Sequence, residues 1–262
     1  MPTALIVEDE PQANELLAML VQLRGYRTES AFTGSEALER AEGARPDIVF
    51  LDLMLPDRSG LDVCRALRSA PATAATPVVM VTARLEAENR VEGFRVGATD
   101  YIPKPYTPDQ ILGAMDRADA CTRRLASGDL EGTIPLDARA GAATLSEVAR
   151  LGALILARNP GSEERARGVG RALVELALRA EAWGTRAGQC LVATLAYTCE
   201  PDRAILTIRD RSGWFRDDPP LDPTGPIARA GLREVDYDPA EGRLGLTLWP
   251  FEPGIRPIRG RP

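Results

Sequence analysis

Histidine is absent from the 262 residues of this chain, and lysine occurs only once. Without an imidazole, the chain cannot form a Ser-His-Asp or Cys-His catalytic centre or a His-ligated metal site, nor can it carry phosphate on a histidine of its own. The four cysteines form no CxxC pair, which favours a reducing compartment, and we expect the cytoplasm. No apolar run approaches the length of a membrane span, and acids at 8–10 occupy the place where a signal peptide needs its apolar core.

Charge is divided unevenly along the chain. Residues 1–120 hold 12 Lys and Arg against 19 Asp and Glu, a net charge of −7, whereas residues 121–262 hold 20 against 19, a net charge of +1. Neither half is the basic block typical of a DNA-binding domain, so we expect no nucleic-acid partner. Every other cation is an arginine, which suggests that Lys104 performs a role that the arginine fork cannot.

The first 120 residues alternate short apolar runs with helical patterns. The runs 4–7, 47–53 and 76–81 are nearly continuous in apolar residues, as expected of strands that are covered on both faces. Five β/α units in this order predict an α/β fold with a five-stranded parallel, doubly wound sheet. Sites in such sheets lie beyond the carboxyl ends of the strands.

Polar side chains stand at those strand ends. The set comprises Glu8, Asp9, Glu10, Asp52, Thr82 and Lys104. Any one acid taken alone is more typical of a polar turn, but a carboxylate between Leu51 and Leu53 is costly to bury unless a cation pairs with it. Clustered carboxylates suit Mg²⁺, and a metal, a lysine, a hydroxyl and a carboxylate nucleophile are the parts of a phosphoryl-transfer site.

Four sequence blocks carry a family resemblance. They are VEDE (7–10), LDLMLPDRSG (51–60), VTAR (81–84) and GATDYIPKPY (97–106). Together they resemble the signature blocks of the receiver domains of two-component response regulators, over about residues 3–120, which predicts a receiver domain over 1–120. The resemblance implies a flavodoxin-like receiver whose Asp52 accepts phosphate from a partner histidine kinase or histidine phosphotransferase.

The same resemblance implies roles for individual residues. Glu8, Asp9, Asp52 and the backbone carbonyl of Met54 would bind Mg²⁺. Lys104 and Thr82 would contact the phosphoryl group, with a cis bond between Lys104 and Pro105. Thr82 and Tyr101 would form the switch, although Tyr101 also fits a plain half-buried core aromatic.

The switch would remodel the face made by the fourth helix, the fifth strand and the fifth helix. The branch that this region resembles forms homodimers through that face. Ala114 stands where that branch generally has an arginine of the charge network between the two subunits.

The second half predicts a different architecture. Residues 121–139 are polar, small and turn-rich, and we predict a linker there. Two helical patterns then precede strand patterns at 189–199, 203–210, 233–237 and 243–249, which predicts an α+β two-layer domain over 140–250. Residues 251–262 form a Pro/Arg-rich tail.

The order of elements over 140–250 resembles the GHKL-type ATP-binding domains of histidine kinases and anti-sigma kinases. Glu175 is followed four residues later by Arg179, where the family has an asparagine that holds Mg²⁺. Asp210 keeps the adenine-reading acid, but the glycines of the family's motif are replaced. The resemblance implies a degenerate domain that binds no nucleotide, in which Glu175 and Arg179 form a surface pair and Asp210 is a turn residue.

These features predict a response regulator with no enzymatic activity beyond phosphoryl acceptance and hydrolysis at its own Asp52. Its second domain would signal through contacts with a protein target, without nucleic acid or membrane. Three alternatives stay open. They are a phosphorylation-gated ATP-dependent protein kinase of the anti-sigma type, a transcription factor, and a phosphate sink whose second domain is only structural.

Overall fold

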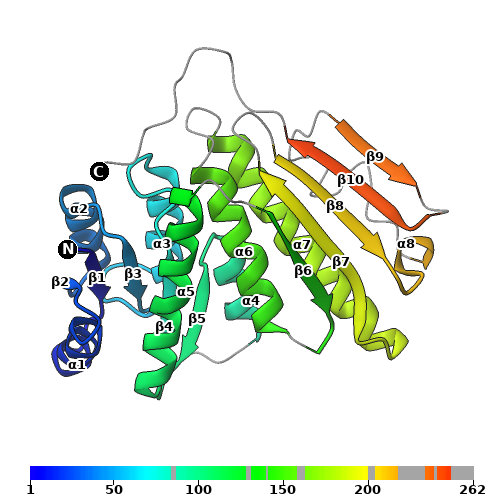
Figure 1. Cartoon of the computed structure of the whole chain (residues 1–262). Coiled ribbons are helices and arrows are strands. Elements are labelled where there is room, and N and C mark those ends of the chain that lie inside the picture. The colour runs from blue at the N-terminus through cyan, green and yellow to red at the C-terminus, as the bar shows by residue number, and fades with distance from the viewer. Residues whose placement is uncertain are drawn as a thin grey trace, which may run out of the picture. The chain divides into compact units, whose positions relative to one another are not determined.

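The computed structural model divides into two compact units, Met1–Thr122 and Arg123–Pro262 (Figure 1). It describes residues 1–83, 87–127, 131–139, 141–157, 163–199, 204–217, 234–238 and 241–248. No helix within these ranges is long and apolar enough to cross a membrane. Each unit contains its own β-sheet, and the two are described separately.

The first unit is built from five β/α repeats. Its elements are β1 (Thr3–Val7), α1 (Pro11–Gln22), β2 (Arg27–Ala31), α2 (Gly34–Ala44), β3 (Ile48–Leu51), α3 (Gly60–Ser69), β4 (Val78–Thr82), α4 (Ala87–Arg95), β5 (Asp100–Pro103) and α5 (Pro108–Ser127). The strands are parallel and lie in the order β2-β1-β3-β4-β5. The predicted doubly wound sheet of five parallel strands is therefore confirmed.

Side chains that alternate along the strands form two separate cores. Leu5 and Val7 of β1 face one layer, which includes apolar residues of α2 and α3. Ala4 and Ile6 of the same strand face the other layer, which includes residues of α1 and α5. Burial on both faces explains why these strands have nearly continuous apolar sequences instead of alternating ones.

The register of the sheet brings the predicted polar residues together. Val7 of β1 pairs with Leu51 of β3, so the residues that follow them, Glu8 and Asp52, leave the sheet side by side. Thr82 of β4 pairs with Pro103 of β5, and Lys104 comes next. Parallel pairing therefore places these strand ends along one edge.

The linker predicted over 121–139 is wrong. Helix α5 continues to Ser127, and a strand, β6, occupies Glu131–Asp137. Ile134 and Leu136 are buried while their neighbours are exposed or half-buried, so this short segment has the alternation of a half-buried strand. Pro135 is tolerated because β6 is an edge strand, which pairs with β7 alone among the described strands.

The second unit combines helices with a sheet of antiparallel strands. Its elements are β6, α6 (Ala142–Ala157), α7 (Glu163–Ala187), β7 (Leu191–Cys199), β8 (Ala204–Asp210), α8 (Trp214–Asp217), β9 (Glu234–Asp238) and β10 (Arg243–Leu248). The strand order is β6-β7-β8-β10-β9. The antiparallel sheet confirms the coarse prediction for this half, whereas the tail predicted over 251–262 lies outside the described residues.

Helices α6 and α7 lie on one side of this sheet (Figure 1). Helix α7 buries the apolar side chains of Leu173, Leu176 and Trp183. The two helices approach each other closely at two glycines, because a Cβ added to Gly152 would lie 2.9 Å from the Cα of Gly170. Backbone therefore packs on backbone at this crossing, and a side chain on Gly152 would collide with the facing helix.

Candidate functional site

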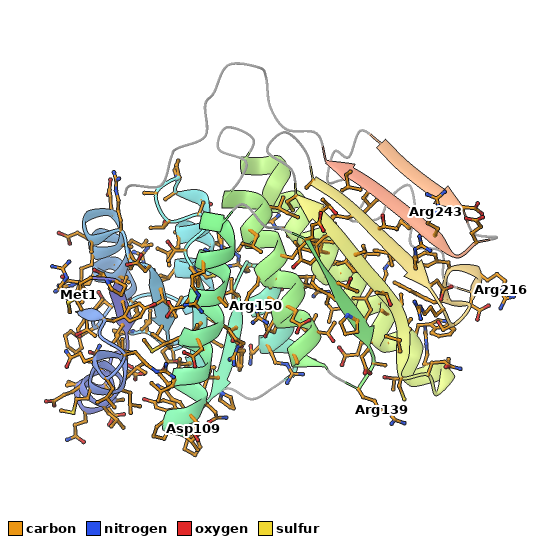
Figure 2. All side chains as sticks on the ribbon, in the orientation of Figure 1. Met1, Asp109, Arg139, Arg150, Arg216 and Arg243 are labelled. Carbon is orange, nitrogen blue, oxygen red and sulfur yellow. The ribbon has the colours of Figure 1, made fainter. Side chains whose placement is uncertain are left out.

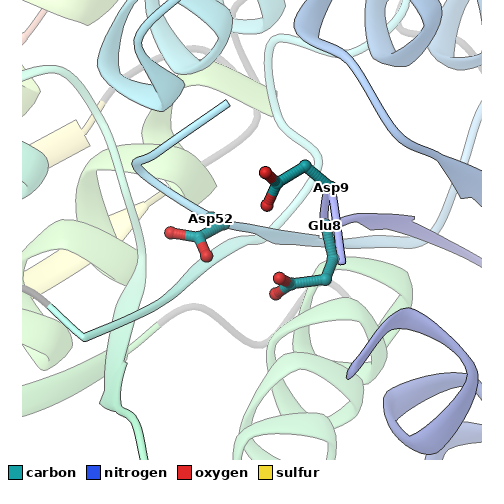
Figure 3. Close-up of side chains that lie close together, drawn as sticks. All are labelled: Glu8, Asp9 and Asp52. Carbon is teal, nitrogen blue, oxygen red and sulfur yellow. The ribbon is translucent and has the colours of Figure 1, made fainter. Parts of the chain in front are cut away.

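Three carboxylates converge at the carboxyl edge of the first sheet. Glu8 and Asp52 are only 3% and 6% exposed, and Asp9 is exposed. One carboxylate oxygen from each lies within 4.8 Å of the others, and Figure 3 shows the three side chains close together. The predicted grouping of these acids therefore exists in the fold.

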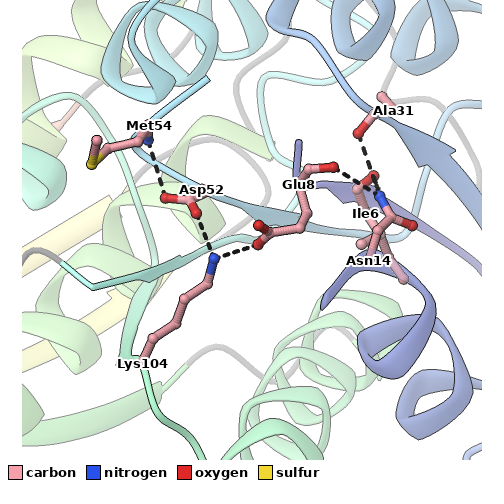
Figure 4. A network of polar contacts seen from close by, with 7 residues as sticks. All are labelled: Ile6, Glu8, Asn14, Ala31, Asp52, Met54 and Lys104. Carbon is pink, nitrogen blue, oxygen red and sulfur yellow. Dashed lines mark hydrogen bonds and ion pairs between the residues drawn. The ribbon is translucent and has the colours of Figure 1, made fainter. Parts of the chain in front are cut away.

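Lys104 joins the two buried carboxylates. Its Nζ donates to Oε2 of Glu8 and to Oδ2 of Asp52, each at 2.5 Å (Figure 4). Its backbone N–H donates to the carbonyl of Thr82 at 2.8 Å, and the bond to Pro105 is cis. A compact ammonium can approach two carboxylates at once in this way, and the planar guanidinium of arginine has a different shape and reach.

Burial and the Lys104 ammonium shift two pKa values. Burial raises the pKa of Glu8, although the hydrogen bond from Lys104 acts in the opposite direction. Burial alone would lower the pKa of Lys104, but the hydrogen bonds to Asp52 and Glu8 outweigh it and leave the pKa raised. Lys104 therefore stays protonated and charged at neutral pH.

The donor set suits a hard divalent cation. With Glu8, Asp9 and Asp52 ionised, one ammonium leaves two negative charges at a site whose ligands are all oxygens. Mg²⁺ prefers oxygen ligands, binds through one or two carboxylates and keeps several waters. Exposed Asp9 leaves room for those waters, so the residues fit this ion.

The loop after β3 holds the Asp52 carboxylate from the other side. The backbone N–H of Met54 donates to Oδ1 of Asp52 at 3.0 Å, as Figure 4 shows. Asp52 itself is tied to the neighbouring strand, because its N–H donates to the carbonyl of Val7 at 2.9 Å. Asp52 is thus fixed at both its backbone and its side chain, and the carbonyl of Met54 lies two residues further on.

The two predicted switch residues occupy different surroundings. Thr82 ends β4 and is fully buried. Tyr101 of β5 is half-buried and contacts the core layer that contains Met80. A Cβ added to Gly93 of α4 would lie 3.9 Å from Cδ2 of Tyr101, so the tyrosine ring lies beside that helix.

Asn14 is a buried polar residue beside the site that the sequence analysis missed. It is 2% exposed, and its Nδ2 donates to the carbonyl of Glu8 at 3.2 Å, with the carbonyls of Ile6 and Ala31 at 3.5 Å (Figure 4). It therefore holds the backbone from which Glu8 projects. A polar residue at the spacing of the buried Leu17 and Val21 was the signal that could have revealed it.

Asp210, at the end of β8, has neighbours of a different kind. Its Oδ1 accepts from the N–H and the hydroxyl of Ser212 and from the N–H of Gly213, at 2.8 to 3.1 Å. Its Oδ2 accepts from the N–H of Phe215 at 2.9 Å. The carboxylate therefore caps the turn into α8. Glu175 and Arg179 lie on α7, and both are half-buried.

A protein-family model for the response regulator receiver domain matches residues 4–116. These residues form a receiver domain. Relatives include the phosphate regulon transcriptional regulatory protein PhoB of Pseudomonas aeruginosa (36% identical over 132 residues, 50% of this chain and 56% of PhoB) and ResD of Bacillus subtilis (40% identical over 108 residues, 41% and 44%). The DNA-binding response regulator MtrA of Mycolicibacterium smegmatis is 37% identical over 136 residues, 50% of this chain and 58% of MtrA.

The receiver domain is also similar to solved structures. A putative response regulator from Chloroflexus aurantiacus is 32% identical, with a TM-score of 0.44, and the match covers 46% of this chain and 99% of that one. The chain spans about half the length of the curated relatives it matches. The family model ends at residue 116, so it does not describe the second unit.

The receiver assignment defines the general chemistry of the first unit. Receiver domains of two-component response regulators bind Mg²⁺ at an acidic pocket, which corresponds here to the cluster of Glu8, Asp9 and Asp52. They are phosphorylated by histidine kinases or phosphotransferases, and they are typically not enzymes.

Proposed function

We propose that this protein is a response regulator that a partner histidine kinase or histidine phosphotransferase phosphorylates on Asp52. The observation that carries the proposal is the position of Asp52, a buried carboxylate at a strand end that shares one lysine with Glu8. In the transfer, a carboxylate oxygen of Asp52 bonds to phosphorus while the bond from phosphorus to the donor's imidazole nitrogen breaks.

The other residues of the site would assist this transfer. Glu8, Asp9, Asp52 and the carbonyl of Met54 would hold Mg²⁺, which neutralises charge on the phosphoryl oxygens. Lys104 would move from its bridge between the two carboxylates to a phosphoryl oxygen, and the Thr82 hydroxyl would donate to another. Hydrolysis of the phosphoaspartate would then return the site to the bridged state.

An apolar stripe on α1 would receive the phosphate donor. Leu16, Met19 and Leu23 are 53%, 53% and 75% exposed, which is unusual for large apolar side chains at helical spacing. Met54, beside Asp52, is also 53% exposed. Met54 offers an apolar contact next to the reacting carboxylate, and the exposed side chains of α1 and its C-cap Leu23 would extend the contact along the helix.

Phosphorylation would act on the output through Thr82 and Tyr101. When Thr82 turns toward the phosphoryl group, the Tyr101 ring would move inward and change the face of α4, β5 and α5, which would also be the face of a homodimer. Two ion pairs hold the elements of this face in place before phosphorylation. Arg65 of α3 contacts Glu92 of α4 at 2.9 Å, and Arg117 of α5 contacts Asp100 of β5 at 2.7 Å.

The second unit would be a degenerate GHKL-like domain that contacts a protein target. Two features argue against ATP binding. The four hydrogen bonds that Asp210 accepts come from its own turn, and Arg179 stands where the family has a metal-binding asparagine. Against DNA binding, residues 121–262 hold 20 Lys and Arg against 19 Asp and Glu, and Arg139, Arg150 and Arg216 lie on different parts of the unit (Figure 2). The named relatives are transcriptional regulators, but the family model does not reach this unit.

A phosphorylation assay tests the central claim. Full-length protein would be incubated with Mg²⁺ and a small-molecule phosphodonor, and acyl phosphate would be measured by intact mass. We expect one phosphoryl group on the wild type and none on Asp52→Asn. The matched control is Asp62→Asn, the same change at an exposed position of α3, and it should be labelled like the wild type. Labelling of Asp52→Asn would reject the proposal.

The output is tested separately, with beryllofluoride as a stable mimic of the acyl phosphate. Affinity capture with and without the mimic should retain a protein target in only one state. Saturable micromolar binding of a fluorescent ATP analogue would instead favour the kinase, and salt-sensitive retention on DNA would favour the transcription factor. If deletion of residues 121–262 leaves the cellular phenotype unchanged, the second unit is only structural.

A further inference from the structure

The loop between β3 and α3 carries two of the groups expected to bind the metal, the side chain of Asp52 and the carbonyl of Met54. Its base is closed, because the N–H of Gly60 donates to the carbonyl of Leu53 at 2.9 Å and Met54 forms a bridge with Ser59. These contacts fix where the loop leaves the sheet and returns. They do not hold the crest of the loop, which lies at residues 55–58.

Asp57 attaches this crest to the first turn of α2. Its Oδ1 accepts from the N–H of Gly34 at 2.7 Å. Its Oδ2 accepts from the N–H of Ser35 at 2.9 Å and from the Ser35 hydroxyl at 2.7 Å. A carboxylate at a helix N-terminus is stabilised by the helix dipole, and these hydrogen bonds are of the strong, charge-assisted kind.

Arg58 strengthens the same attachment. Its Nη2 donates to the Ser35 hydroxyl at 2.8 Å, and its Nε lies 3.3 Å from Oδ2 of Asp57. A Cβ added to Gly34 would lie 2.5 Å from Cγ of Arg58, so the stem of the arginine lies directly on the helix start. Two consecutive residues of the crest therefore contact α2.

Helix α2 already has a cap from its own sequence. The Thr33 hydroxyl accepts from the N–H of Glu36 at 3.1 Å, and the Glu36 carboxylate accepts from the N–H of Phe32 at 2.9 Å. The Thr33 hydroxyl thus serves the third N–H of the helix, as the first half of a capping box does. Asp57 serves the two N–H groups before it, so its bonds both cap α2 and tie the loop to the helix.

We propose that Asp57 is a positioning residue of the metal site, which holds the crest of the 52–59 loop on α2 and thereby sets the place of the Met54 carbonyl. The inference rests on the proposed function, because Met54 is a metal ligand only if the site works as described above. Hydrogen-bond partners that orient metal ligands from behind typically change metal affinity by about 10-fold or more when they are removed.

Magnesium binding to the full-length protein tests this role. Calorimetric titration would compare the wild type with Asp57→Ala and with Thr33→Ala as the matched control. Both substitutions remove a cap from the start of α2, but only the first releases the loop. We expect Asp57→Ala to raise the Mg²⁺ dissociation constant about 10-fold and Thr33→Ala to leave it near the wild-type value. The fluorine NMR signal of bound beryllofluoride should be weaker in Asp57→Ala than in the wild type and should be unchanged in Thr33→Ala.

The possible results separate this inference from the proposed function. If the wild type binds Mg²⁺ and Asp57→Ala binds it equally well, or if both variants lose affinity equally, Asp57 is only a helix cap. A wild type that binds no Mg²⁺ overturns the proposed function as well. If Asp57→Ala does not fold, Asp57→Asn keeps the acceptor for Gly34 and loses the acceptor for Ser35. Unchanged affinity in that variant also overturns the inference.

Discussion

Each unit of the chain places an aspartate at the carboxyl end of a strand, yet the two carboxylates have different neighbours. Asp52 accepts one backbone hydrogen bond, from Met54, and contacts the Lys104 ammonium beside two further acids. Asp210 accepts four hydrogen bonds from its own turn. A carboxylate has about four positions for accepting hydrogen bonds, so the chain itself satisfies Asp210.

Under the proposed function, this difference separates a reactive carboxylate, Asp52, from a structural one. A side-chain ammonium could give way to a metal and a phosphoryl group, whereas backbone N–H groups cannot leave without unfolding the turn. Position at a strand end therefore identifies a candidate, and the donors around the carboxylate decide its role.

The largest effect is expected from removing the cation that distinguishes Asp52. Lys104→Met should slow phosphorylation of Asp52 by about 100-fold, because the phosphoryl oxygens lose a preorganised positive charge. Phosphorylation rates with a small-molecule donor would measure this effect. Lys104→Arg is the matched control. Its phosphorylation rate should lie between those of the wild type and Lys104→Met, since arginine restores the positive charge but not the shape of the ammonium. A normal rate in Lys104→Met would mean that the lysine only neutralises buried acids.

The second prediction concerns Asp210. Asp210→Ala should destabilise the second unit by about 2 kcal/mol, because N–H groups at a turn lose their acceptor. Urea unfolding would be followed by tryptophan fluorescence, since all three tryptophans lie beyond residue 122. Phosphorylation of Asp52 should remain unchanged. Unaltered stability together with altered binding of an ATP analogue would show that Asp210 belongs to a ligand site, and the contrast with Asp52 would be lost.

A third prediction compares two glycines at the crossing of α6 and α7. A Cβ on Gly152 would meet the Cα of Gly170 at 2.9 Å, whereas a Cβ on Gly170 would lie 3.7 Å from the Cα of Gly152. Gly152→Ala should therefore destabilise the second unit by about 1 to 3 kcal/mol. Gly170→Ala should be neutral or stabilising by up to about 1 kcal/mol, because alanine favours helix. The same fluorescence assay measures both, and equal effects would contradict the predicted asymmetry.

The smallest effect is a pH dependence confined to the first unit. Burial raises the pKa of Glu8 above its ordinary value of 4.5 in the folded, metal-free protein. The folded protein then keeps a proton that the unfolded chain releases. This contribution to stability is complete below pH 4.5 and is lost as the pH rises through the folded pKa. Denaturation at several pH values without Mg²⁺ would show it, and Glu8→Gln should remove it.

Much of the first unit could be predicted because one physical signal repeats along it. Apolar runs mark strands that are covered on both faces, and their pairing in register places Glu8, Asp52 and Lys104 together. Asn14 and Asp57 were missed because their importance lies in contacts with distant backbone groups. Such contacts have no fixed spacing in the sequence.

The second unit was harder to predict because single residues in it are compatible with more than one local structure. Strand β6 contains Gly132 and Pro135, residues that usually interrupt strands, and its place at the sheet edge is what permits the proline. Asp210 could be recognised as a strand-end acid, and the degenerate motif around it predicted a turn residue. In the fold, four donors from its own turn contact this carboxylate.

Helix α5 runs from Pro108 to Ser127 and passes without a break through Thr122, where the first unit ends. Its first part is anchored to the receiver, because Asp116 pairs with Arg24 at 2.9 Å. In a helix, each inserted residue turns everything that follows by about 100°. Anyone who grafts this receiver onto another output must therefore choose the fusion point by helical phase as well as by length.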